Sequence, residues 1–97
     1  MLIVDDDSDF LDEAAEYIGR RGIQCHKAGS PDEAERIFEA YENIALVITD
    51  LRMPERSGIK LLEDLNSRYS ETRSYDAIMI TGHAVREDVI RVPDRIV

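Results

Sequence analysis

The stretch Ala45-Leu-Val-Ile-Thr-Asp50-Leu-Arg-Met-Pro54 decides how the rest of this chain is read. Four apolar residues lead through a threonine to one carboxylate, Asp50, and a proline follows four residues later. An aliphatic run of this length, closed by a helix-breaking residue, indicates a strand that is buried on both faces. The pattern therefore predicts a central strand that carries Asp50 at its carboxyl end.

Two further aliphatic runs also end in residues with oxygen-bearing side chains. Residues 1–4 lead into Asp5 and Asp6, and residues 77–80 lead into Thr81. The carboxyl ends of parallel strands meet at one edge of an open sheet, which is where such sheets bind ligands. We therefore expect the chemistry of this chain at that edge.

Amphipathic repeats and turn residues separate these strands. Ser30-Pro31-Asp32-Glu33 is a capping box with proline at the first helical position, and Asp7 is best explained as a helix N-cap. The remaining signals predict a weak strand over 23–28, a loop over 68–76, and helices over 8–21, from Pro31 to about Asn43, from Ile59 to about Ser67, and over 84–91.

Strands and helices alternate along the whole chain, which is typical of an α/β domain with a doubly wound parallel sheet. We expect residues 1–97 to form a single domain. The net charge of −9 argues against nucleic acid and anionic membranes as partners. With no apolar run of about 18 residues and no leader pattern, a cytoplasmic location is expected. One cysteine, Cys25, allows neither an internal disulfide nor a cysteine metal cluster.

Asp5, Asp6 and Asp50 would bring three carboxylates together at the predicted site. Carboxylates at close range repel one another, and a divalent cation relieves that repulsion. A few carboxylates, waters and a phosphate oxygen are the ligands that Mg²⁺ prefers. An aspartate beside such a metal can attack a phosphoryl group to give an acyl phosphate, and Thr81 could then hold the phosphate oxygens.

Three motifs carry a resemblance to the receiver domain of bacterial two-component response regulators. Leu2-Ile-Val-Asp5-Asp6-Asp7 is similar to the acidic turn of that family, and Ile48-Thr-Asp50-Leu-Arg-Met-Pro54 resembles its phosphoacceptor strand and loop. Ile78-Met-Ile-Thr81-Gly82 resembles its fourth strand with the switch hydroxyl. The three motifs occur in the family's order, and the match extends to about residue 91.

The resemblance implies a phosphoacceptor signalling domain of a phosphorelay, with a flavodoxin-like sheet in the order 2-1-3-4-5. Asp50 would accept a phosphoryl group from a sensor histidine kinase, a phosphotransfer protein or a small acyl phosphate. Mg²⁺ would be held by Asp6, Asp50 and the backbone carbonyl of Arg52, with Asp5 acting mainly through water. Thr81 would contact the phosphate, and the domain would be regulatory, not an enzyme acting on other molecules.

The chain departs from the family after about residue 91, where the fifth strand and fifth helix are missing or reduced. No lysine follows Lys60, so the family's phosphate-pairing lysine has no counterpart. Phosphate on Asp50 would then be balanced by the metal and Thr81 alone. The fourth strand, predicted over 77–81, would form an exposed edge made of Ile78, Met79 and Ile80. Such an edge predicts either homodimerisation or a substitute strand from Arg95-Ile-Val97.

Two alternatives remain open at this point. A receiver-like binding or assembly module would work through its exposed edge and ignore phosphorylation. A phosphatase of the haloacid dehalogenase type also uses a strand-end aspartate, but it needs a second aspartate two residues later, where this chain has Arg52. The intact acidic cluster favours the phosphoacceptor, whereas the missing lysine and last strand favour the assembly module.

Overall fold

The computed structural model describes residues 1–80 and 89–91, which form one five-stranded sheet and three helices. The strand order is β2-β1-β3-β4-β5, as the family resemblance predicted. Neighbouring strands from β2 to β4 are parallel, whereas β5 is antiparallel to β4. The elements are β1 (Leu2–Val4), α1 (Ser8–Gly19), β2 (His26–Ala28), α2 (Pro31–Ala40), β3 (Leu46–Asp50), α3 (Gly58–Tyr69), β4 (Asp76–Ile80) and β5 (Val89–Arg91).

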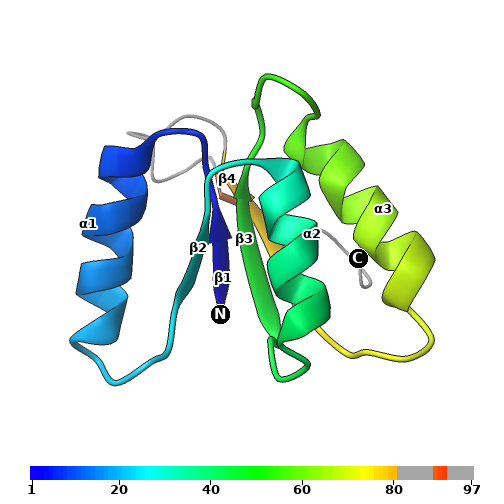
Figure 1. The fold of residues 1–97 in the computed structure, drawn as a ribbon, viewed down its shortest axis with the longest axis horizontal. Helices are drawn as coiled ribbons and strands as arrows, with labels where there is room; N and C mark the ends of the chain where they lie inside the picture. The colour runs from blue at the N-terminus through cyan, green and yellow to red at the C-terminus, as the bar shows by residue number, and fades with distance from the viewer. Residues whose placement is uncertain (81–88, 92–97) are drawn as a thin grey trace.

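Helices cover both faces of the sheet. Figure 1 shows α1 on one side of the strands and α2 and α3 together on the other. The alternation of side chains along β1 explains this arrangement, because Leu2 and Val4 join the core beneath α2 and α3 while the buried Ile3 faces the opposite way. The doubly wound architecture predicted from the sequence is confirmed.

The main core lies between the sheet and the pair α2 and α3. Phe38 of α2 is fully buried at its centre, and its ring meets those of Tyr69 and Tyr75 edge to face at centroid distances of 5.1 and 5.0 Å. The guanidinium of Arg73 lies over the same Phe38 ring, with its carbon 3.6 Å from the centroid. These contacts hold the segment between α3 and β4 against the end of α2.

The predicted starts of α1 and α2 are confirmed, and α3 begins at Gly58, one residue before the predicted start. Asp7 caps α1 by accepting from the Phe10 N–H, and the Ser30 hydroxyl accepts from the Glu33 N–H at the start of α2. In a usual capping box the Glu33 carboxylate would accept from the N–H of the N-cap residue, Ser30. Here it accepts from the N–H of the preceding residue, Gly29, at 2.8 Å. Helix α1 ends at Gly19, and Gly22 supplies the positive φ of 81° that turns the chain toward β2.

Several predicted boundaries were wrong. Helices α1 and α2 end two and about three residues earlier than expected, and β2 begins at His26 instead of residue 23. Helix α3 continues to Tyr69, so the predicted loop over 68–76 is reduced to 70–75. The reason is tertiary, because Tyr69 packs against the core and extends the helix through polar residues that carry no periodic signal of their own.

The predicted helix over 84–91 is contradicted at its end, because Val89–Arg91 form strand β5. The pairs Ile78↔Arg91, Met79↔Ile90 and Ile80↔Val89 place β5 along β4. The edge of β4 is therefore not exposed, which removes the reason for the predicted homodimer and corrects the position of the substitute strand. Residues 84–88 and 95–97, on which the rest of these predictions fall, lie outside the described residues.

In the part of the chain that the structure describes, none of the helices combines the length and the apolar character needed to cross a membrane.

Candidate functional site

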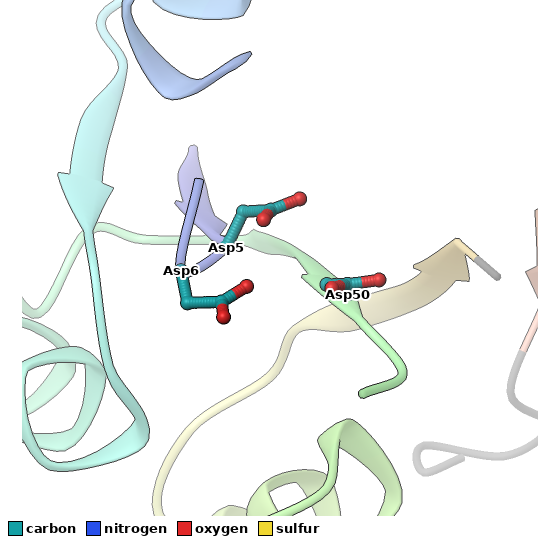
Figure 2. A group of neighbouring side chains, drawn as sticks. All are labelled: Asp5, Asp6 and Asp50. Atoms are coloured by element: carbon teal, nitrogen blue, oxygen red, sulfur yellow. The ribbon is translucent and has the colours of Figure 1, made fainter. Parts of the chain in front are cut away.

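Three carboxylates meet where β1 and β3 end. The closest ligand oxygens of Asp5, Asp6 and Asp50 all lie within 4.8 Å of one another. Figure 2 shows Asp5 and Asp6 where the chain leaves β1 and Asp50 at the end of β3, with the three carboxylates extending in the same general direction. The cluster predicted from the ends of the aliphatic runs is present.

Strand register explains why these residues meet. Strands β1 and β3 are parallel neighbours, and Val4 pairs with Thr49. The next residue on each strand is an aspartate, so Asp5 and Asp50 leave the sheet side by side. Asp6 follows in the turn, which brings a third carboxylate to the same edge.

The three aspartates differ in exposure. Asp5 is 2% exposed and Asp50 is 7% exposed, whereas Asp6 is open to solvent. One oxygen of Asp5 accepts a hydrogen bond from the Asp7 N–H at 2.9 Å, which fixes the turn into α1. The N-terminus of α1 begins in the next residues, and its partial positive charge favours carboxylates nearby.

This donor set fits Mg²⁺. The ligands are all carboxylate oxygens, two of the aspartates are buried, and the spacing is close enough for one cation to lie among all three, bound directly or through water. Two buried carboxylates and a third beside them repel one another strongly unless a cation lies between them. An exposed Asp6 leaves one side open for waters and a phosphate oxygen, as Mg²⁺ requires.

The loop after Asp50 is bonded to β4 at its start and closed onto its own first residue at its end. The Leu51 N–H donates to the carbonyl of Ile80 at 3.0 Å, and the Gly58 N–H donates to the carbonyl of Leu51 at 2.8 Å. Met53 is buried, while the side chain of Arg52 is exposed. The backbone of Arg52 therefore lies in a short loop whose ends are fixed next to Asp50.

The structure brings together three of the predicted site residues, Asp5, Asp6 and Asp50, and places Arg52 two residues beyond Asp50. Thr81 lies outside the described residues, one position after Ile80, which pairs with Asp50 in the register of β3 and β4. The roles assigned to these five residues stay predictions.

Sequence reasoning overlooked Arg56, which lies in the loop between β3 and α3. Its guanidinium contacts the carboxylates of Asp32, Glu35 and Asp64. Asp32 and Glu35 are 24 and 21 residues away from Arg56 in the chain, so no local sequence pattern indicates these contacts. A non-local ion cluster of this kind becomes visible only when α2 and α3 are placed side by side.

Comparison with known families gives a match to the response regulator receiver domain over residues 1–95. Among curated proteins, the two-component response regulator PprB of Pseudomonas aeruginosa is 34% identical over 90 residues, which is 93% of this chain. The chain spans only 33% of the length of PprB. The similarity therefore concerns one domain of a longer protein.

Solved structures agree with this match. A response regulator receiver domain protein from Clostridium thermocellum superimposes with a TM-score of 0.75 at 32% identity, covering 86% of this chain and 64% of that one. The response regulator TrrA of Thermotoga maritima, solved in complex with Mg²⁺ and BeF, gives a TM-score of 0.73 at 26% identity. That comparison covers 90% of this chain and 73% of TrrA.

Proposed function

The chain belongs to the response regulator receiver domain family, and we propose that Asp50 is the residue that accepts the phosphoryl group. The observation that carries this proposal is the position of Asp50, at the end of β3 with the carboxylates of Asp5 and Asp6 within 4.8 Å. Asp50 is 7% exposed, so it is almost buried but still reaches solvent. No finding favours the assembly module that the sequence left open.

In the proposed reaction, a carboxylate oxygen of Asp50 attacks the phosphorus of the donor. The donor is a phosphohistidine of a sensor histidine kinase or phosphotransfer protein, or a small acyl phosphate such as acetyl phosphate. With phosphohistidine as donor, the P–N bond breaks as the new O–P bond forms, and the histidine leaves as the neutral side chain after its nitrogen is protonated. With acetyl phosphate as donor, the P–O bond to the acetyl group breaks and acetate leaves. The product is an acyl phosphate on Asp50.

Asp5, Asp6, Asp50 and the backbone carbonyl of Arg52 would hold Mg²⁺, with Asp5 acting mainly through water. When bound, the ion would supply positive charge against the oxygens of the phosphoryl group. The donor set of this chain supports that assignment, and TrrA, solved with Mg²⁺ and BeF, has the same fold. The packing around β3 keeps Asp50, the proposed nucleophile, in place.

Thr81 completes the proposal as the residue that contacts the phosphate oxygens, because it follows Ile80, the register partner of Asp50. We further propose that residues 1–97 act as one regulatory domain in the cytoplasm, and that the domain is not an enzyme toward other molecules.

The test is phosphoryl incorporation from acetyl phosphate. We expect the wild-type chain to gain phosphate in the presence of MgCl₂ and to lose this ability when EDTA removes the metal. Asp50→Asn should not gain phosphate, whereas Asp12→Asn, which changes an exposed aspartate of α1, should behave as wild type. Equal incorporation into the wild type and Asp50→Asn would refute the assignment.

A further inference from the structure

Arg56 joins the loop that follows Asp50 to two helices. Its Nη2 lies 2.7 Å from a carboxylate oxygen of Asp32 in α2, and its Nη1 lies 2.6 Å from oxygens of Glu35 in α2 and Asp64 in α3. A guanidinium has five N–H donors in one plane, so it can serve several carboxylates at once. One side chain therefore connects the loop, α2 and α3.

Two of these contacts are shielded from solvent. The side chains of Arg56 and Glu35 are 19% and 17% exposed, and that of Asp64 is 28% exposed, whereas Asp32 lies at the rim with 75% exposed. Hydrogen bonds to Glu35 and Asp64 raise the pKa of Arg56, and the hydrogen bond from Arg56 lowers the pKa of Asp64. Ion pairs that are partly buried are screened less by salt than exposed ones.

A second pair of cations contacts the same carboxylates from outside. Arg68 lies 3.8 Å from Glu35, and Lys60 lies 3.3 Å from Asp64, with 57% and 59% of their side chains exposed. Both belong to α3 and neither belongs to the loop. Arg68 is therefore a matched control, because replacing it removes one positive charge near Glu35 without releasing the loop.

Between its fixed ends the loop has two further anchors, the buried side chain of Met53 in the core and the ion cluster of Arg56. Leu51 is held by the carbonyl of Ile80, and Gly58 is held by the carbonyl of Leu51, which leaves residues 52–56 to be fixed by other contacts. Arg52 and Glu55 have exposed side chains. Among the charged side chains of this loop, it is Arg56 that reaches neighbouring helices in the part of the chain that the structure describes.

We propose that Arg56 is a positioning residue for the metal site: by tying the loop over 51–57 to α2 and α3, it holds the Arg52 carbonyl where Mg²⁺ binds. This inference rests on the proposed function, because the Arg52 carbonyl is a ligand only there. Outer contacts that orient a metal ligand affect metal affinity by about tenfold or more when removed. Arg56 thus acts through Arg52 and does not touch the phosphoryl group.

The first arm of the test asks whether Arg56 holds the loop. Hydrogen exchange is measured for the Gly58 amide, which donates to the Leu51 carbonyl, in wild type, Arg56→Met and Arg68→Met. We expect faster exchange at Gly58 in Arg56→Met, with the core of α3 near Leu62 unchanged, and wild-type exchange in Arg68→Met. Unchanged exchange at Gly58 in Arg56→Met would overturn the inference.

The second arm asks whether the tie matters for the metal. Calorimetric titration with MgCl₂ alone should give a dissociation constant about tenfold higher for Arg56→Met than for wild type and for Arg68→Met. A purely structural role would lower the unfolding midpoint and leave this constant unchanged, which would also overturn the inference. If Arg56→Met does not fold, Arg56→Lys, which keeps the charge but loses the fork, supplies the same comparison.

The acetyl phosphate and MgCl₂ experiments distinguish failure of the proposed function of Asp50 from failure of the inference about Arg56. If the wild type binds Mg²⁺ but takes no phosphate from acetyl phosphate, the proposed function fails while the role of Arg56 is still decided by the MgCl₂ titration. If the wild type takes phosphate and Arg56→Met binds Mg²⁺ equally well, the inference fails alone. If the wild type binds no Mg²⁺, both are refuted.

Discussion

Gly58, the first residue of α3, lies against the backbone of Asp50 with no room for a side chain between them. A Cβ atom on Gly58 would overlap the carbonyl oxygen of Asp50, and it would lie 3.1 Å from both the carbonyl carbon of Asp50 and Cγ2 of Thr49. The start of α3 and the end of β3 are thus packed backbone to backbone. This contact fixes the end of the strand that carries the proposed phosphoacceptor.

Replacing Gly58 with alanine should therefore destabilise the fold and disturb the site. We expect Gly58→Ala to lower the free energy of unfolding by about 1–3 kcal/mol, the usual effect of adding a methyl group to a packed position. Urea unfolding followed by circular dichroism measures this change. Gly19→Ala is the matched control, because a Cβ at Gly19 meets nothing within 4 Å. Equal stability of Gly58→Ala and Gly19→Ala would show that the close contact is absent.

Mg²⁺ should stabilise the folded chain, because it relieves the repulsion among Asp5, Asp6 and Asp50 and binds poorly to the unfolded state. At about one hundred times its dissociation constant, the ion should raise the free energy of unfolding by about 2.7 kcal/mol. Urea titrations with MgCl₂, compared with NaCl at equal ionic strength, measure the increase. Asp6→Asn should reduce it, and an equal gain in Asp6→Asn and wild type would contradict a role for this carboxylate.

Arg73 should contribute to stability through the end of α2. Its guanidinium lies over the Phe38 ring and donates hydrogen bonds to the carbonyls of Phe38 and Tyr41, which fall at the end of that helix. We expect Arg73→Met to lower the free energy of unfolding by about 1–3 kcal/mol, since the partly buried carbonyl of Phe38 and the carbonyl of Tyr41 lose their donor. The exposed Arg68 serves as control, and a loss in Arg68→Met as large as in Arg73→Met would refute this account.

His26 should give the fold a small pH dependence. Burial, and secondly the charged N-terminus, lower the pKa of His26 from its ordinary value of 6.5. The unfolded chain therefore binds the proton more tightly, so the stability that neutral His26 contributes is present above pH 6.5 and is lost as the pH falls through the lower, folded pKa. Urea unfolding across this range should show a shallower pH slope for His26→Gln, and parallel slopes would contradict the prediction.

The strands that form the site were predictable from the sequence because their signal is local. Each aliphatic run is continuous, and parallel strands must end at the same edge, so Asp5, Asp6 and Asp50 could be brought together without a structure. The helix starts were equally predictable, since caps such as Ser30 act on residues only three positions away. Both kinds of signal survive tertiary packing, which explains why these predictions were confirmed.

The remaining features depend on contacts between distant residues. Tyr69 is helical because it packs against Phe38, 31 positions earlier in the chain. The polar residues before Tyr69 give no periodic signal, so the sequence does not show that α3 continues to it. The two adjacent apolar residues Val89 and Ile90 are compatible with either a helix or a strand. They form a strand because this segment pairs with β4. Arg56 and the close approach of Gly58 to Asp50 have no local signature at all.

The most direct test of the central claim is to locate the phosphoryl group after reaction with acetyl phosphate and MgCl₂. Borohydride reduces an acyl phosphate on aspartate to homoserine, and mass spectrometry of the resulting peptides identifies the position. We predict homoserine at position 50, its loss in Asp50→Asn, and unmodified Asp5 and Asp6. Modification of Asp5 or Asp6 instead, or no modification of a folded wild-type chain, would contradict the account.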